Sequence, residues 1–155
     1  MIKAVIFDLG NTLMDQDTKE IFPYAVEILK ELTGKYKLGL ITNTQSQDLF
    51  EKIMDYLKNI GIHGFFDHIL VSGELGFHKP DPRIFGLMFK ELGVTPDECV
   101  MIGNTISSDI FGGNRVGKNT VLIQPSDEYK SSDWENPDHK IKSLKELSPI
   151  LRNQT

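Results

Sequence analysis

The chain has 155 residues, of which 39% are hydrophobic and 25% charged, and its formal net charge is −5. That length suits one domain with its own core, and the composition is that of an ordinary globular protein. The negative charge and the scattered basic residues argue against a nucleic-acid partner and against an anionic membrane surface. We expect a single domain over residues 1–155.

Two features bear on the compartment. The single cysteine, Cys99, excludes an internal disulfide bond and fits a reducing environment. The first apolar run is too short for a signal peptide and ends in Asp8, and no stretch approaches the length of a membrane span. The sequence therefore predicts a cytoplasmic protein with no membrane partner.

Strands and helices alternate in the first half of the chain. An apolar run predicts a buried strand over residues 3–7, and apolar residues at helical spacing then predict a helix that ends at Gly34. A second strand is expected over 37–41, followed by a helix that ends at Gly61. A third strand is expected over 68–71.

The same alternation continues in the second half. Asp81 and Pro82 predict a helix start that combines a capping residue with a proline in the first turn, and this helix runs to about Gly93. Residues 95–98 have the spacing of a capping box and predict a short turn. The remaining elements are expected in this order: a strand over 100–102, a helix over 107–116, a strand over 120–123, a loop over 124–139 and a helix over 141–151.

Strands interleaved with helices predict an α/β fold with a Rossmann-like, doubly wound parallel sheet of about five strands. The strands are apolar at nearly every position, which is typical when helices cover both faces of the sheet. Residues 16–41 hold one helix and one strand, so no cap domain is expected there. The open site that results suits a bulky substrate, a macromolecule, or closure by a neighbouring subunit in a homo-oligomer.

Polar residues follow the predicted strands. In chain order they are Asp8, Thr42, Asn43, Lys79, Asn104 and Asp109. A carboxylate after a buried run is costly unless its charge is needed, and ligands of open parallel sheets bind beyond the carboxyl ends of the strands. Carboxylate oxygens together with a substrate phosphate suit Mg²⁺. The positions therefore point to phosphoryl chemistry at one edge of the sheet.

Four segments resemble the motifs of the haloacid dehalogenase superfamily. IFDLGNTL resembles the first motif, an apolar strand followed by Asp-x-x-x-Thr, and LGLITN resembles the second. GFHKPDPRIF resembles the third, which carries a lysine, and VMIGNTISSDIFGGNRVG resembles the acidic fourth. The four occur in the family's order between residues 5 and 117. The resemblance implies an Mg²⁺-dependent phosphohydrolase that acts on a phosphorylated substrate.

The resemblance also implies roles. Asp8 would be the nucleophile that forms an aspartyl phosphate, and Lys79 would neutralise the charge that Asp8 shares with the phosphate. The implied phosphate ligands are Thr42, Asn43 and the main-chain N–H groups through Asn11. The implied Mg²⁺ ligands are Asp8, the Gly10 carbonyl, Asp109 and Asn104. From the residues alone, Asp81 is better explained as a helix cap, and Asp109 also suits the first turn of a helix.

Two positions depart from the family pattern. Active phosphatases of the family carry a second Asp two residues after the nucleophile, where this chain has Gly10. General acid–base help is worth roughly 10²–10⁴ in rate, so we expect a modest rate unless Asn11, Asp15, Asp17 or a bound water replaces the acid. Asn104 stands where the fourth motif often begins with Asp, which lowers the expected metal affinity.

Two alternatives remain beside the phosphohydrolase. Gly10 and Asn104 favour a binding or regulatory module that keeps the fold with a weakened site. A metal-independent dehalogenase would need an enclosed apolar pocket, which a chain without a cap does not offer. The one tryptophan, Trp134, lies in the polar segment 124–139, where an isolated aromatic residue is more often part of local packing than one that overhangs a site or an interface.

Overall fold

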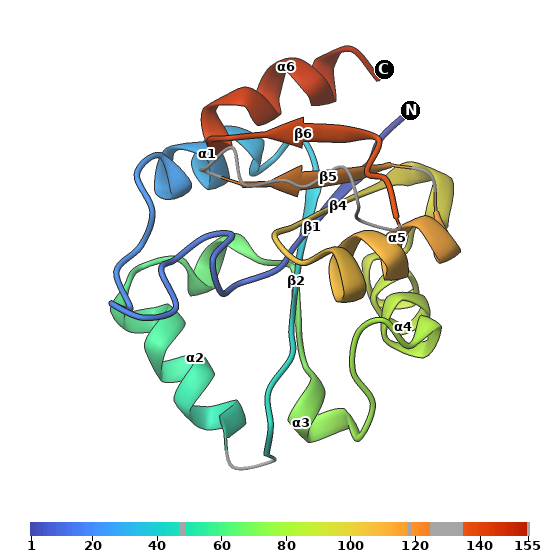
Figure 1. Cartoon of the computed structure of the whole chain (residues 1–155). Coiled ribbons are helices and arrows are strands. Elements are labelled where there is room, and N and C mark those ends of the chain that lie inside the picture. The colour runs from blue at the N-terminus through green and yellow to red at the C-terminus, as the bar shows by residue number, and fades with distance from the viewer. Residues whose placement is uncertain (47–48, 118, 125–134, 155) are drawn as a thin grey trace.

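The computed structural model describes residues 1–46, 49–117, 119–124 and 135–154. Its centre is a six-stranded parallel sheet with the strand order β3-β2-β1-β4-β5-β6 (Figure 1). The strands are β1 (Ala4–Phe7), β2 (Lys37–Thr42), β3 (His68–Val71), β4 (Cys99–Gly103), β5 (Thr120–Ile123) and β6 (His139–Ile141). The predicted doubly wound parallel sheet is confirmed, and each of the five expected strands is present.

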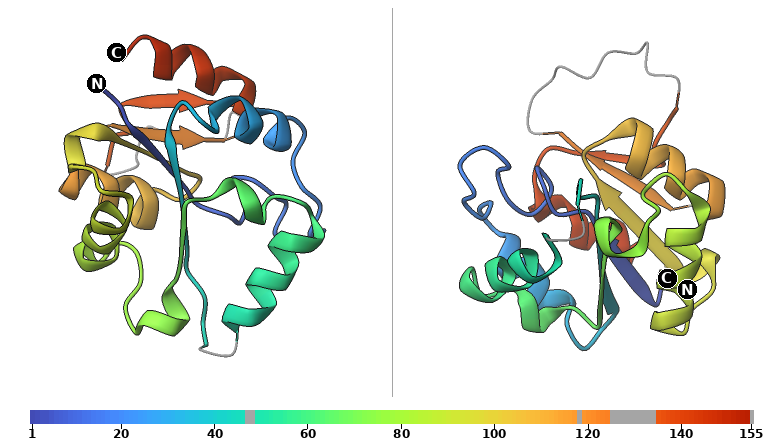
Figure 2. Two further views of the ribbon diagram at one scale, coloured as in Figure 1. Left: turned by 180° about the vertical axis from the view of Figure 1, so that it is seen from behind. Right: turned by 90° about the horizontal axis from the view of Figure 1, so that it is seen from below.

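Helices cover both faces of the sheet (Figures 1 and 2). They are α1 (Ala25–Leu32), α2 (Leu49–Asn59), α3 (Ser72–Leu75), α4 (Pro82–Leu92), α5 (Phe111–Val116) and α6 (Leu147–Arg152). Short helical turns are η1 (His63–Phe65), η2 (Pro96–Glu98), η3 (Ile106–Ile110) and η4 (Leu144–Glu146). Helices α1, α2 and α6 pack on one face, while α4 packs on the other. Among the described helices, none has the length and apolar character of a membrane span. The described residues form no cap domain.

The core explains why the strands are apolar at nearly every position. Val5 and Phe7 of β1 belong to the cluster under α1 and α2, whereas Ala4 and Ile6 belong to the cluster under α4, and all four are buried. Burying a large apolar side chain stabilises the fold by about 1.5–3 kcal/mol. A sheet covered on both faces gains this contribution from successive residues of each strand, so the period-two alternation of a one-sided sheet is missing.

The capping residues are where the sequence predicts them. The Asp81 side chain accepts a hydrogen bond from the Arg83 N–H, and Gly93 ends α4 with a φ of 69°. Such a positive φ favours glycine because it has no Cβ. The capping box around η2 is also present, with Thr95 and Glu98 as its partners. Asp81 is therefore a helix cap, as its position next to a proline predicts.

The structure corrects the C-terminal prediction. Residues 139–141 form strand β6, where the sequence predicts the end of a loop (124–139) and the start of a helix (141–151). In this strand, Ile141 lies opposite Ile123 of β5. Ile141 is the one fully buried residue of this short strand, so the sequence contains no apolar run that predicts the strand. Residues 125–134, which include Trp134, lie outside the described residues.

The helix expected over 107–116 is also different. It consists of the wide π-helical turn η3 followed by α5. Wide turns of this kind are rare and occur frequently at functional sites. The turn here carries Asp109, whose N–H donates to the Thr105 carbonyl at 2.9 Å.

Candidate active site

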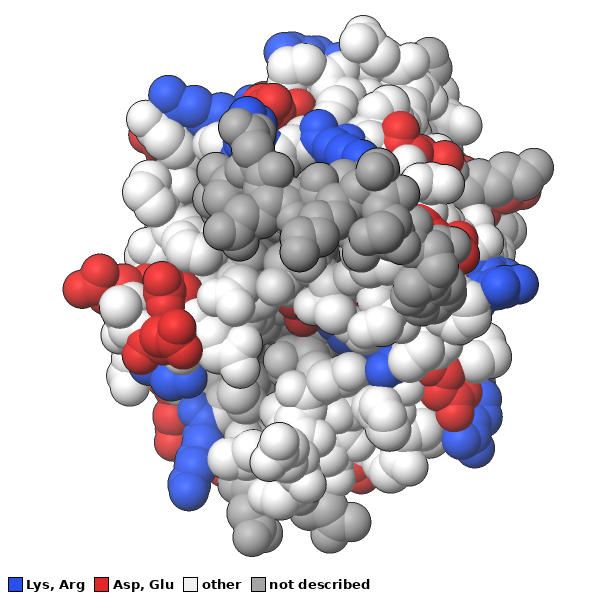
Figure 3. All heavy atoms as spheres, in the orientation of Figure 1, with Lys and Arg blue, Asp and Glu red and all other residues white. Residues whose placement is uncertain are grey.

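The predicted polar residues come together at the carboxyl edge of the sheet. Asp8 follows β1, Thr42 ends β2, Asn104 follows β4, and Lys79 comes from the loop between α3 and α4. These four line one cavity of about 680 Å³. The molecular surface is hollowed near the middle of this face, with acidic and basic side chains at the floor (Figure 3). The cavity lies beyond β1, on whose two sides the chain winds in opposite directions, as expected for an open α/β sheet.

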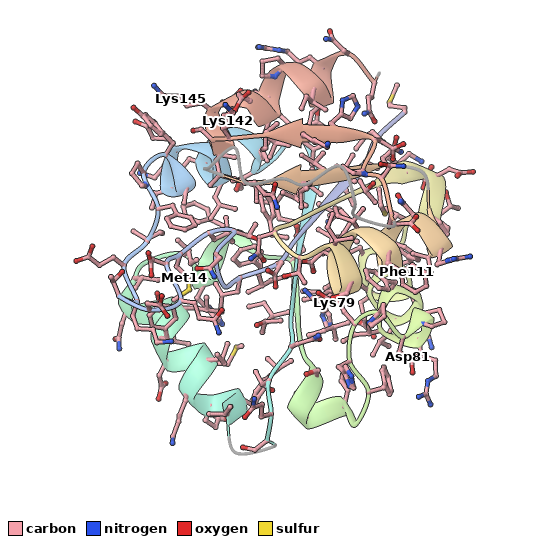
Figure 4. All side chains as sticks on the ribbon, in the orientation of Figure 1. Met14, Lys79, Asp81, Phe111, Lys142 and Lys145 are labelled. Atoms are coloured by element: carbon pink, nitrogen blue, oxygen red, sulfur yellow. The ribbon has the colours of Figure 1, made fainter. Side chains whose placement is uncertain are left out.

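Lys79 lies at the centre of the charge cluster. Its Nζ is 2.9 Å from Asp8 Oδ1 and 2.6 Å from Asp109 Oδ1, and the residue is only 2% exposed. Burial lowers the pKa of the Lys79 amine, but the attraction of Asp109 and Asp8 outweighs burial and raises the pKa above its ordinary value. The amine therefore stays charged beside the predicted nucleophile. Figure 4 shows Lys79 toward the centre of the molecule and Asp81 farther out, beside α4.

Asp8 is held from two sides. Its Oδ1 accepts from Lys79, and its Oδ2 accepts from the Thr12 hydroxyl at 3.2 Å. Thr12 is fully buried, while 12% of the Asp8 side chain is exposed toward the cavity. Sequence reasoning did not predict this contact between Thr12 and Asp8. The Asp-x-x-x-Thr spacing of the first motif was the signal for it.

Asp109 is enclosed by protein. Its Oδ1 accepts from Lys79, its Oδ2 accepts from the Thr105 N–H at 3.1 Å, and the residue has no exposed surface. A Cβ on Gly103 would collide with the Asp109 carboxyl group, so the glycine makes room for it. Burial raises the pKa of the Asp109 carboxyl to about 6, against the attraction of Lys79. Its role as a metal ligand stays a prediction. Its contact in the structure is with Lys79.

Asn104 lies against Gly10 and Asp8. With its amide nitrogen turned toward Asp8, Asn104 donates to the Gly10 carbonyl at 3.1 Å and to Asp8 Oδ2 at 3.0 Å. The Gly10 carbonyl and Asp8 Oδ2 thus lie next to the end of the Asn104 side chain, whose own oxygen would face them if the amide were rotated. Such a set of hard oxygen ligands fits a divalent cation. No three His, Cys, Asp or Glu side chains gather at a metal site within the described part of the chain, so a cation would also depend on the carbonyl and the amide.

Asn43 acts on the lysine loop. Its Nδ2 donates to the Lys79 carbonyl at 3.0 Å, and its Oδ1 accepts from the Lys79 N–H at 2.9 Å. Both polar atoms of the side chain therefore help to hold Lys79 next to the end of β2. A phosphate contact of Asn43 stays a prediction. Thr42, beside it, is buried and faces the cavity.

The structure does not bring every predicted residue to the cavity. Asn11 is not among the described cavity residues, and its N–H donates to the Met14 carbonyl at 2.6 Å. The Asn11 N–H, which was predicted to bind phosphate, is therefore already bonded to the Met14 carbonyl. Asp15 and Asp17 do not line the cavity either. Hydrogen bonds from the Thr18 and Asp17 N–H groups lower the pKa of Asp15, so this carboxyl group is a poor proton donor.

The sequence did not predict one wall of the cavity. Leu49, Ile53 and Tyr56 of α2 line it, together with Met14. The Tyr56 hydroxyl donates to the Lys19 carbonyl at 2.8 Å, which ties the loop after β1 to α2. The spacing of these α2 residues predicted a helix face but gave no sign that part of the face borders a cavity. The site therefore joins a charged floor to an apolar wall.

Known proteins resemble this chain over most of its length. It is 34% identical over 135 residues to a glyceraldehyde 3-phosphate phosphatase of Methanopyrus kandleri, covering 84% of this chain and 56% of that protein. It is 36% identical over 146 residues to the N-acylneuraminate-9-phosphatase of Rattus norvegicus, covering 94% of this chain and 54% of that protein. The chain thus spans about half the length of these curated relatives.

The fold has close counterparts as well. The crystal structure of a HAD phosphatase from Thermococcus onnurineus superimposes with a TM-score of 0.86 at 21% identity, over 97% of this chain and 98% of that one. A sequence model of the haloacid dehalogenase-like hydrolase family matches residues 14–117, which include Thr42, Lys79 and Asp109 and begin after Asp8. The chain belongs to the haloacid dehalogenase-like hydrolase family.

Proposed function

We propose that the chain is a divalent-metal-dependent phosphohydrolase that transfers a phosphoryl group to Asp8 and then to water. One observation carries the proposal. The Asp8 carboxylate, held by Lys79 at 2.9 Å, faces a cavity at the end of the central strand. A carboxylate beside a buried, charged amine suits attack on an anionic phosphate, because the amine offsets the repulsion between the two anions.

The first step is phosphoryl transfer to the enzyme. An Asp8 oxygen forms a bond to phosphorus, the bond from phosphorus to the leaving oxygen breaks, and the leaving oxygen takes a proton from solvent. Lys79 offsets the charge that Asp8 shares with the phosphate, and Thr42 donates to a phosphate oxygen. In the second step, water attacks phosphorus and the Asp8 carboxylate is released. Asp8 returns to its starting state, so one chain turns over many substrates.

A divalent cation, Mg²⁺, would neutralise phosphate charge in this site. We propose Asp8, the Gly10 carbonyl and the Asn104 side-chain oxygen as its direct ligands. Asp109, the fourth implied ligand, is assigned an indirect role because, unlike Asp8, it has no exposed surface and does not line the cavity. With one carboxylate in direct contact, the expected affinity for the cation is lower than for a site with two or three.

The proposed substrates are phosphate monoesters and acyl phosphates of small molecules. A cavity of about 680 Å³ lies within the usual range for small-molecule sites. The two relatives described above are named for glyceraldehyde 3-phosphate and for N-acylneuraminate 9-phosphate, which supports a phosphorylated small molecule. Because Gly10 cannot protonate a leaving oxygen, acyl and aryl phosphates should be cleaved faster than sugar phosphates.

The test is hydrolysis of acetyl phosphate and para-nitrophenyl phosphate, with Mg²⁺ or with EDTA. We expect phosphate release that needs Mg²⁺ and is lost in Asp8→Asn, which keeps the shape of the nucleophile. Asp17→Asn is the matched control, since Asp17 is exposed and does not line the cavity. Release that survives Asp8→Asn, or that EDTA leaves unchanged, would sink the proposal. Halide release from a 2-haloacid without metal is the assay for the dehalogenase alternative.

A second candidate function is a phosphate- or metal-binding module without turnover. The observation that favours it is the contact between the two departures from the family pattern, in which Asn104 lies 3.1 Å from the Gly10 carbonyl. Both positions lack the carboxylate that relatives with activity carry. Phosphate binding in the presence of Mg²⁺, without release from either test compound, would favour this module over the enzyme.

A further inference from the structure

We propose that Gln16 positions the water that hydrolyses the aspartyl phosphate, in place of the side chain that Gly10 lacks. The inference rests on the proposed function, because it concerns the second step of that reaction. It assigns a role to a residue that none of the sequence motifs includes. Gln16 lies in the loop between β1 and α1, eight residues after the nucleophile.

The space above Gly10 borders the Gln16 side chain. A Cβ at this position would lie 3.2 Å from Gln16 Oε1, 3.6 Å from its Cδ and 3.8 Å from its Cγ. The end of the Gln16 side chain therefore lies in direct contact with the place where a side chain of residue 10 would begin. Gly10, Gln16 and Asp8 line the same cavity. The amide thus lies beside the position from which a second aspartate would extend into the cavity.

The loop between β1 and α1 holds Gln16 in place. The Gln16 N–H donates to Asn11 Oδ1 at 3.0 Å, and Asn11 adopts a φ of 57°. An isolated bridge pairs Gly10 with Met14. Asp15 accepts from the next two N–H groups, at 2.8 and 2.9 Å. These contacts fix the backbone on both sides of Gln16, so its side chain starts from a defined position over Gly10.

The chemistry of a glutamine amide also suits this role. A glutamine amide has one acceptor oxygen and two donor hydrogens, but it neither takes up nor releases a proton at neutral pH. It orients an attacking water in phosphoryl transfer by GTPases, where no side chain needs to act as a strong base. Gln16 can do the same here by accepting a hydrogen bond from the water through Oε1.

The step balances without a protein base. The water oxygen forms a bond to phosphorus, and the bond between phosphorus and the Asp8 oxygen breaks with its electron pair returning to the carboxylate. The proton of the water leaves with the released phosphate. Lys79 stabilises the Asp8 carboxylate as it departs. Orientation of the water is then the contribution of Gln16, and it acts in the second step alone.

The experiment measures the lifetime of the phosphorylated enzyme. The chain is labelled with acetyl phosphate and Mg²⁺, quenched at successive times and analysed by intact mass. We expect Gln16→Ala to lengthen the lifetime and to lower kcat by about 10-fold or more, with the rate of label formation unchanged. Gln16→Met, which keeps the length of the side chain without its polar atoms, should do the same. Gln154→Ala, which changes a glutamine after α6 that does not line the cavity, is the control and should behave as the unchanged chain.

A second arm tests the occupied space. Gly10→Asp should raise the turnover of a sugar phosphate more in a Gln16→Ala background than in the original chain, because the new carboxylate no longer meets the glutamine amide. An equal gain in both backgrounds overturns the inference. A labelled Asp8 whose lifetime does not change in Gln16→Ala overturns it as well and leaves the proposed function standing. Absence of both label and phosphate release overturns the proposed function and this inference together.

Discussion

Asn43 and Lys79 are joined by a reciprocal pair of hydrogen bonds, one at 2.9 Å and one at 3.0 Å, between the Asn43 amide and the Lys79 main chain. Lys79 lies on a loop, so no neighbouring strand fixes its height above the sheet. The pair fixes that height by fastening the loop to the residue that follows β2. The position of the buried amine therefore depends on an exposed side chain more than thirty residues earlier.

Asn43→Ala should lower kcat/KM by about 10- to 100-fold, because small displacements of a catalytic group are costly in rate. The free energy of unfolding should fall by only about 1 kcal/mol, since water can replace the lost hydrogen bonds at an exposed position. Acetyl phosphate turnover and urea unfolding check the two numbers. Asn119→Ala, which removes a hydrogen bond to the Cys99 carbonyl away from the cavity, is the control. An unchanged kcat/KM would show that the loop holds Lys79 without Asn43.

Asp109→Ala should destabilise the fold by about 3–5 kcal/mol. The substitution leaves the Lys79 amine buried with one carboxylate in place of two, and a buried charge that loses its partner is strongly unfavourable. Urea unfolding of this variant should show a lower midpoint. The exposed Asp97→Ala should change the free energy of unfolding by less than about 0.5 kcal/mol. A loss that small in Asp109→Ala would contradict the ion pairs described here.

Cys99 should make stability fall at alkaline pH. Burial, and then the charge of Glu98, raises the pKa of this thiol from 9.0 to about 12. Since the pKa is raised in the folded state, the contribution to stability is complete below pH 9 and is lost as pH rises toward 12. The free energy of unfolding of the original chain should therefore fall faster between pH 9 and 11 than that of Cys99→Ala. Parallel curves for the two proteins would contradict the shift.

Ser148→Ala should stabilise the protein by about 1 kcal/mol. The Ser148 hydroxyl is buried in α6 and finds no partner among the described residues, and an unpaired buried hydroxyl is unfavourable. Alanine also has the better helix propensity. A thermal midpoint higher by about 2–4 °C is the expected result. Ser143→Ala is an opposite control, because Ser143 caps η4 by accepting from the Lys145 N–H and its loss should lower the midpoint.

The sequence was most informative where one physical signal acted alone. Asp8 and Thr42 follow apolar runs, and the ends of buried parallel strands meet at one edge, so their common location could be predicted. The caps of α4, Asp81 and Gly93, follow from local backbone chemistry in the same way. These predictions need neighbouring residues and the rules of a sheet, and no knowledge of distant contacts.

The rest depended on contacts between distant residues or on weak local signals. Nothing near Lys79 shows that its amine pairs with Asp109, thirty residues later. Strand β6 has a single fully buried residue, Ile141, which is too little for a pattern. The wide turn η3 was predicted as part of a regular helix because it runs directly into α5. Nothing in the sequence places Gln16 beside Gly10, because only the folded loop brings the two residues together.

The charge cluster also bears on the order of assembly. Asp8, Lys79 and Asp109 follow β1, α3 and β4 in the chain, and the attraction of both carboxylates favours the charged form of the buried lysine. A chain shortened before Asp109 would keep the nucleophile and the lysine but would leave that lysine with half its counter-charge. Fragments that end between α4 and β4 should therefore be inert, and activity should return in a single transition when the missing piece is supplied as a separate peptide.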